Sequence, residues 1–136
     1  MNSDQIKIVK TSFASLLPKA DAIAISFYDK LFELAPEVRR LFKDDLSDQR
    51  HKLMLTLATV VGELHRLDTI LPTVKALAVR HKDYGARDEH YAVVGDALIH
   101  ALAHHAGPAF GDPERRAWTA AYAGLSGIML DAARAA

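Results

Sequence analysis

The chain has 136 residues, of which 50% are hydrophobic and 25% are charged, the usual balance of one globular domain with a single core. Its 17 lysines and arginines cancel its 17 aspartates and glutamates, so we expect neither nucleic acid nor an anionic membrane as the main partner. There is no cysteine, which excludes disulfides, thiolate metal sites and cysteine nucleophiles.

The N-terminal sequence Met-Asn-Ser-Asp-Gln lacks the basic and apolar regions of a signal peptide. No apolar run approaches the roughly 20 residues that a membrane-spanning helix needs. We therefore expect a cytoplasmic protein without a membrane span, made of a single domain over residues 1–136.

Apolar residues recur at helical spacing along the whole chain, and no stretch shows the alternation of a strand. The Ala35-Pro36 step should end the second helix, because a residue before proline avoids the α conformation. Asp112 is predicted to cap the last helix, with Pro113 at its first position. The predicted helices cover residues 4–17, 19–34, 46–66, 72–83, 88–105 and 112–133, with a further short helix around 36–42. An all-α fold of six to seven helices follows, with lengths too uneven for a four-helix bundle.

The first informative polar residue is His81, which shares one face of the predicted helix 72–83 with Val74 and Leu77. A lone histidine on an apolar face is more often a core residue whose ring is satisfied by a carbonyl. Neutral imidazole is also the commonest metal-binding side chain. The residue by itself leaves both hypotheses open.

Other polar and aromatic residues interrupt apolar stripes in the first half of the chain. Gln49 begins a stripe that continues with Leu53 and Leu57 at intervals of four. Tyr28 lies on the second predicted helix, and Phe42 follows the proline turn. Taken singly, each has an ordinary explanation: Gln49 as a helix end that reaches water, Tyr28 as a core tyrosine, and Phe42 as a loop residue that fills the edge of the core.

Two stripes in the second half are mainly core positions, and they contain Tyr91, Val94, Leu98 and Leu102 in one helix and Trp118, Tyr122, Leu125 and Met129 in the other. His100 and His104 are four residues apart and could chelate zinc, but no third ligand accompanies them at helical spacing. A solvated histidine-rich face is the favoured interpretation.

Taken together, these positions resemble the globin family, and more narrowly the bacterial single-domain haemoglobins and the haem domain of flavohaemoglobins. The stretches that carry the resemblance are 26–32 (SFYDKLF), 36–42 (PEVRRLF), 49–53 (QRHKL), 77–81 (LAVRH), 90–95 (HYAVVG) and 117–122 (AWTAAY). They occur in family order and cover nearly the whole chain. Residues 77–81, 107–110 and 117–118 are also similar to neuroglobins. The resemblance implies a globin fold around one haem pocket.

The resemblance also implies haem b as the cofactor and a role for each of several residues. His81 would be the proximal iron ligand, with its second ring nitrogen held by a carbonyl or a similar acceptor. Phe42 would stack on the porphyrin, and Tyr28 and Gln49 would line the distal pocket and donate hydrogen bonds to bound dioxygen. Leu53, one turn after Gln49, would limit access. The other residues expected at the cofactor are Leu77, Arg80, Tyr91, Val94 and Tyr122.

The chain departs from the flavohaemoglobin pattern on the proximal side. Tyr91 matches the tyrosine of the proximal network, but the glutamate position of that network falls at Ala133, and Asp131 should point to another face. We therefore do not expect a strongly electron-pushing, peroxidase-like proximal side. His51 lies about 200° around the helix from Gln49 and should face away, so the sixth iron position is expected to be open or weakly occupied in the ferrous state.

Reversible binding of dioxygen, nitric oxide and carbon monoxide at ferrous iron is the function that the resemblance implies. The alternative is nitric oxide dioxygenase activity, which would require a separate reductase because this chain carries no flavin or nicotinamide domain. A gas sensor or a haem-free globin module is less favoured, since a haem-free module would have no reason to keep His81, Phe42, Tyr28 and Gln49 together. The sequence leaves the oligomeric state and the physiological gas open.

Overall fold

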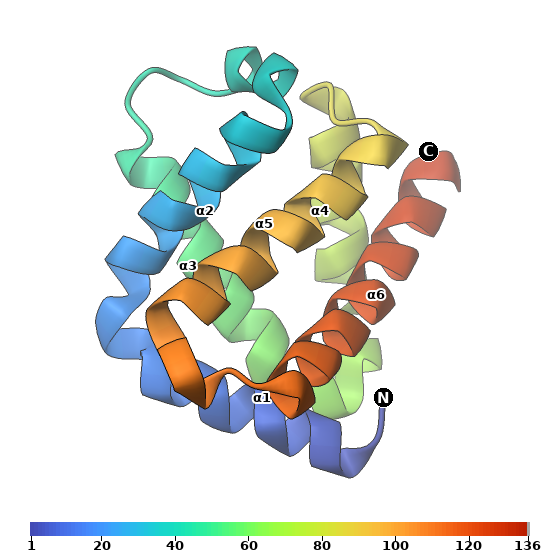
Figure 1. Cartoon of the computed structure of the whole chain (residues 1–136). Helices are drawn as coiled ribbons and strands as arrows, with labels where there is room; N and C mark the ends of the chain where they lie inside the picture. The colour runs from blue at the N-terminus through green and yellow to red at the C-terminus, as the bar shows by residue number, and fades with distance from the viewer. Residues whose placement is uncertain (136) are drawn as a thin grey trace.

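The computed structural model describes residues 1–135, which form α-helices joined by short 3₁₀ turns and contain no strand (Figure 1). The helices are α1 (Ser3–Leu16), α2 (Ala20–Leu34), α3 (Ser47–Gly62), α4 (Leu71–Asp83), α5 (Asp88–Ala106) and α6 (Asp112–Ala135). The 3₁₀ turns are η1 (Leu17–Lys19), η2 (Pro36–Leu41), η3 (Leu64–Ile70) and η4 (Gly107–Ala109). The predicted all-α class is confirmed, and so is the short helix expected around residues 36–42.

Most helix ends lie within two residues of their predicted positions, but the prediction of one helix over 46–66 is wrong. The helix ends at Gly62, and Arg66 has a non-helical conformation with φ −153° and ψ 58°. The Glu63 carboxylate accepts hydrogen bonds from Arg66 Nε at 2.7 Å and from Thr69 Oγ1 at 3.3 Å. These side-chain bonds hold the chain in a 3₁₀ turn that leads into α4.

The predicted cap of the last helix is also wrong in its details. The Gly111 carbonyl accepts the Arg115 N–H at 3.0 Å, so Gly111 and not Asp112 occupies the cap position. The Glu114 carboxylate turns back and accepts the Gly111 N–H at 2.9 Å. Asp112 is therefore the first residue of the helix, and Pro113, which the sequence predicted at that position, is the second.

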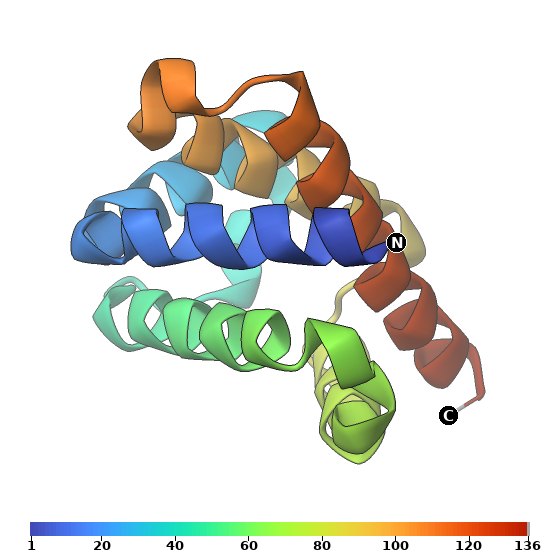
Figure 2. The same ribbon diagram turned by 90° about the horizontal axis from the view of Figure 1, so that it is seen from below.

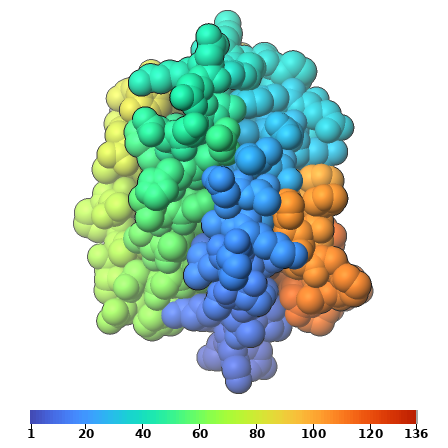
Figure 3. All heavy atoms as spheres, turned by 90° about the vertical axis from the view of Figure 1, so that its left-hand side faces the viewer, coloured from blue at the N-terminus to red at the C-terminus, as the bar shows by residue number. Residues whose placement is uncertain are grey.

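The helices pack in crossed pairs. α2 lies across α5, α4 packs against α6, and α1 packs against α6 while also touching α3 and α5. Seen from below, α1 runs between α3 on one side and α5 on the other (Figure 2). On the face shown in Figure 3, α3 lies beside α2 on one side and beside the η3–α4 segment on the other. None of the helices in the described chain combines the length and apolar character that crossing a membrane requires.

The buried apolar residues form two separate clusters. The larger cluster joins α1, α2, α3, α5 and α6 and contains the fully buried Val9, Ile23 and Leu102. The smaller one consists of Val74 and Ala78 of α4 packed on Met129 of α6. Because α4 is held mainly by α6 and η3, its apolar face is not sealed into the main core.

The crossing of α5 and α6 depends on a glycine. A Cβ added at Gly95 would lie 2.7 Å and 2.8 Å from two ring carbons of Tyr122. That ring is held in place, because the Tyr122 hydroxyl donates to the Tyr91 carbonyl at 2.6 Å. We expect Gly95→Ala to lower the free energy of unfolding by about 1–3 kcal/mol, measured by guanidinium denaturation.

Gly124→Ala in α6 is the matched control, since a Cβ there meets no atom within 4 Å. This substitution should leave the stability unchanged or raise it by about 0.5–1 kcal/mol. Equal effects of the two substitutions would show that the contact with Tyr122 does not limit residue 95.

Candidate functional site

Tyr28 and Gln49, which the sequence predicts to act together, are joined by a hydrogen bond. Tyr28 lies on α2 with 3% of its surface exposed, and Gln49 lies half-buried in the first turn of α3. Gln49 Nε2 donates to the Tyr28 hydroxyl oxygen at 3.1 Å. Because the phenol accepts this bond, its own proton is available for a further acceptor.

An aromatic cluster surrounds the Tyr28 ring. Its centroid lies 4.8 Å from that of Phe27, 5.9 Å from that of Phe32 and 5.6 Å from that of Phe42. Phe42 packs edge-on against both Tyr28 and Phe32, each at 5.6 Å, and remains half-buried. The Tyr28 ring is therefore held in an apolar setting by two rings of its own helix and by one ring from the residue after η2.

Burial raises the pKa of Tyr28 above its usual value of 10, and this effect outweighs the hydrogen bond from Gln49, which lowers it. The side chain consequently stays a neutral phenol at physiological pH. A neutral phenol can donate a hydrogen bond, whereas a phenolate cannot.

His81 lies in the last turn of α4 and is exposed, which excludes the alternative of a core histidine. Its Nδ1 lies 2.7 Å from the carbonyl oxygen of Leu77. A carbonyl only accepts, so Nδ1 is the donor of this contact, and in the neutral form of the ring Nε2 then keeps its lone pair. This is the tautomer that an imidazole needs in order to bind a metal through Nε2.

The remaining predicted site residues lie at several depths. Leu53 of α3 and Val94 of α5 are half-buried at the margin of the main apolar cluster. Leu77 is half-buried beside the smaller cluster, and Arg80 is exposed in the last turn of α4. His51 is exposed.

Tyr91, in the first turn of α5, is linked to Tyr122 of α6. Tyr91 packs beside the α4 cluster, and burial raises its pKa, with a smaller contribution from the negative charge of Asp88. Burial also raises the pKa of Tyr122 strongly, so both phenols are neutral. The Tyr122 hydroxyl is committed to the Tyr91 carbonyl rather than to His81.

At Ala133, where the resemblance places a glutamate, the structure has a buried methyl group. The Ala133 carbonyl accepts a hydrogen bond from Lys82 Nζ at 3.0 Å, which ties the end of α4 to α6. Asp131 is exposed. Lys82 was not singled out by the sequence analysis, because a basic residue at the end of a helix gives no periodic signal.

These residues fit a haem in three respects. In the neutral tautomer that the Leu77 carbonyl favours, His81 offers the lone pair of Nε2. Tyr28 and Gln49 offer neutral hydrogen-bond donors on different helices. Apolar side chains near them, including Phe42, are only half covered by the protein, as expected for the walls of a site that receives an apolar ring.

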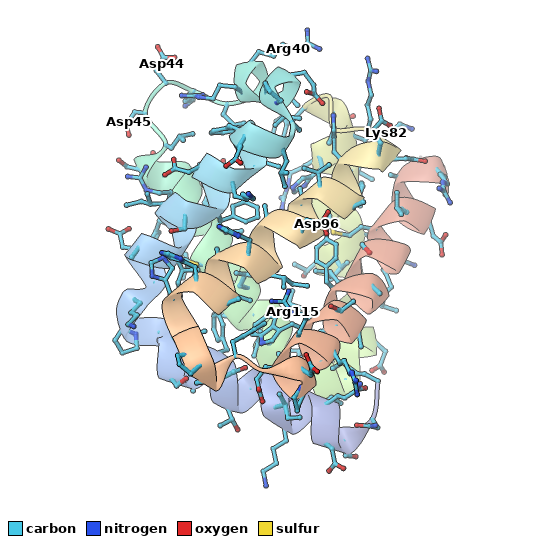
Figure 4. All side chains as sticks on the ribbon, viewed as in Figure 1. Arg40, Asp44, Asp45, Lys82, Asp96 and Arg115 are labelled. Carbon is cyan, nitrogen blue, oxygen red and sulfur yellow. The ribbon has the colours of Figure 1, made fainter. Side chains whose placement is uncertain are left out.

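The histidine pair on α5 lies elsewhere. The parallel rings of His100 and His104, with centroids 6.2 Å apart, line an open groove of about 520 Å³ between α5 and α6. Asp96 and Arg115, labelled in Figure 4, lie on its two sides. In the part of the chain that the structure describes, no three histidine or acidic side chains are arranged to hold a metal ion, so a zinc site there has no support.

Comparison with known proteins identifies one family. Residues 25–129 match the globin family model. The flavohemoproteins of Vibrio cholerae and Bacillus subtilis are each 28% identical to the chain, over 96% and 97% of its length. The flavohemoprotein of Bordetella parapertussis is 30% identical over 94% of the chain. The chain spans about a third of these relatives, with 33% to 34% of their length covered.

Solved structures share the fold. The bacterial globin of Campylobacter jejuni has a TM-score of 0.88 at 24% identity, covering 98% of this chain and 96% of its own. An engineered carbene transferase from Rhodothermus marinus, provisionally named a nitric oxide dioxygenase, has a TM-score of 0.89 at 24% identity and covers 98% and 94%. At such identities the likeness concerns the fold alone.

The raised pKa of Tyr28 predicts how stability changes at high pH. Between pH 10 and the higher native pKa, the unfolded chain loses the phenolic proton while the folded chain keeps it, so the free energy of unfolding should fall as the pH rises above 10. In Tyr28→Phe this fall should be smaller, as measured by urea denaturation at several pH values. The same slope in both proteins would contradict the shift.

Proposed function

The chain belongs to the globin family, and on that basis we propose that it binds haem b through His81 and holds a diatomic gas beside Tyr28 and Gln49. Dioxygen is the first ligand of the proposal, with nitric oxide and carbon monoxide as further ligands. The observation that carries it is the hydrogen bond from Gln49 to the buried Tyr28 hydroxyl, because it leaves a neutral phenol proton for a ligand.

When bound, haem supplies a ferrous iron that takes up diatomic gases reversibly and shifts electron density onto dioxygen. Tyr28 and Gln49 then serve as fixed donors toward a partly negative ligand, and such bonds are stronger than bonds between neutral groups. Phe42 and Leu53 exclude water from the side chains that do this. His81 is oriented by the Leu77 carbonyl, so its ring does not have to be ordered when the cofactor binds.

The proximal side favours reversible gas binding. His81 Nδ1 meets the neutral Leu77 carbonyl, and the residue at position 133 is an alanine without a carboxylate. A neutral acceptor draws the Nδ1 proton less strongly than a carboxylate would, so the imidazole pushes less electron density toward a metal. Weaker electron donation to the metal favours a gas ligand that dissociates again without being chemically converted.

Nitric oxide dioxygenation is the second candidate. The curated relatives are flavohemoproteins, and one structure of the same fold is provisionally named a nitric oxide dioxygenase. The reaction joins one dioxygen and one nitric oxide into nitrate and consumes one electron, which we propose is supplied by a separate reductase. A donor pair that retains dioxygen serves this reaction as well as storage.

The visible spectrum of the purified chain tests the cofactor and its ligand together. We expect a Soret band that shifts on reduction and again on exposure to oxygen. His81→Ala should lose haem or bind it at least about tenfold more weakly, because the variant lacks the metal-binding nitrogen. His100→Ala, which removes an exposed histidine from the α5 groove, is the control and should keep the spectrum.

A wild-type chain that shows no Soret band even after haem is added would contradict the cofactor proposal. An unchanged spectrum in His81→Ala would instead contradict only the assignment of the ligand.

Tyr28→Phe keeps the aromatic packing and removes the donor. A hydrogen bond to a charged group contributes about 1.5–3 kcal/mol, so we expect oxygen to dissociate about tenfold faster or more, measured by stopped-flow mixing of the oxygenated protein with carbon monoxide. An unchanged rate would remove Tyr28 from this role. Nitrate formed over many turnovers with an added flavin reductase would favour the dioxygenase, and formation of less than one nitrate per haem would favour reversible binding.

A further inference from the structure

Arg39 lies in η2 where three consecutive backbone carbonyls converge. Its Nη1 donates to the Lys43 carbonyl at 3.0 Å and, at a longer 3.5 Å, to the Phe42 carbonyl. Its Nη2 donates to the Asp44 carbonyl at 3.1 Å. Residues 42–46 connect η2 to α3 outside any helix, and this one guanidinium gives the carbonyls of residues 42–44 the partners that helical hydrogen bonds supply elsewhere.

The same guanidinium also contacts the aromatic cluster. Its central carbon lies 5.1 Å from the ring centroid of Phe32, and the side chain is half-buried. Phe32 in turn packs against Phe42 at 5.6 Å and against Tyr28 at 5.9 Å. Arg39 therefore links the backbone of the connection to the rings that surround the distal phenol.

A second set of hydrogen bonds fixes the end of segment 42–46. Asp45 Oδ1 accepts the Ser47 N–H at 2.9 Å and the Ser47 hydroxyl at 2.7 Å, at the first residue of α3. Gln49 is two residues further on. The segment 42–46 is thus held near its beginning by Arg39 and near its end by Asp45. It leads directly into α3, the helix that carries Gln49.

We propose that Arg39 is a positioning residue of the distal site: it sets the conformation of residues 42–46 and, through it, the positions of Phe42 and of Gln49. The part that concerns Phe42 and Gln49 as ligand contacts rests on the proposed function. A guanidinium presents five N–H donors in one rigid planar fork, whereas the ammonium of a lysine has three donors on a flexible stem and does not fix their geometry in this way.

The adjacent Arg40 is the matched control. It carries the same charge in the same turn, but it is exposed and points outward at the edge of the molecule (Figure 4). The test compares Arg39→Met and Arg39→Lys with Arg40→Met.

Hydrogen exchange of the full-length chain as purified reports on the connection directly. The amides of Ser47 and Arg50, which bond to Asp45 Oδ1 and to the Leu46 carbonyl, should exchange at least about tenfold faster in Arg39→Met than in the wild type or in Arg40→Met. Equal protection in the two methionine variants would overturn the proposal. If Arg39→Met does not fold, the same amides are measured in Arg39→Lys. Wild-type protection in that variant would show that the planar guanidinium is not required, which overturns the proposal.

The C–O stretching band of the carbon monoxide complex reports on the distal donors. We expect it to shift or split in Arg39→Met and to stay unchanged in Arg40→Met. A lower unfolding midpoint with an unshifted band would mean that Arg39 only stabilises the fold, which contradicts a positioning role. If the wild type binds no haem, the proposed function fails, while the exchange of Ser47 and Arg50 still decides the part played by Arg39.

Discussion

The packing of α4 on α6, apart from the main core, is the constraint on which the rest of this structure depends. Val74 and Ala78 are buried against Met129, while the other helices close around their own apolar cluster. In this arrangement His81 is exposed at the end of α4, and Phe42 and Leu53 are half covered at the margin of the main cluster.

The two sides of the candidate site share one electrostatic character. On the distal side, a buried neutral phenol is paired with a neutral amide, and burial keeps the phenol protonated. On the proximal side, the imidazole donates to a peptide carbonyl, and position 133 provides no carboxylate. The hydrogen-bond partners of Tyr28 and of His81 are therefore neutral groups, and the full charge nearest to Tyr28 in the contacts described above is that of Arg39 over the Phe32 ring.

The distal helix is placed by polar contacts as well as by packing. The connection before α3 is irregular, and an irregular segment needs partners for its backbone groups. Arg39 and Asp45 supply those partners from side chains that lie within a few residues of the groups they bind. The position of Gln49 relative to Tyr28 follows from this short segment together with the contact between α2 and α3.

The sequence by itself determined the all-α class, nearly all helix ranges and the shared face of Val74, Leu77 and His81, because helical periodicity and proline boundaries are local properties. The family motifs further placed Tyr28 and Gln49 in one site. Only the tertiary structure decided that α3 ends at Gly62, that Gly111 rather than Asp112 caps α6, and that Arg39 serves three carbonyls. It also decided that His81 is exposed and that Lys82 reaches Ala133, 51 residues away. The Lys82 contact depends on how α4 and α6 cross, whereas the end of α3, the cap of α6 and the Arg39 contacts are local and depend on rotamers and turn geometry, and none of these leaves a periodic trace in the chain.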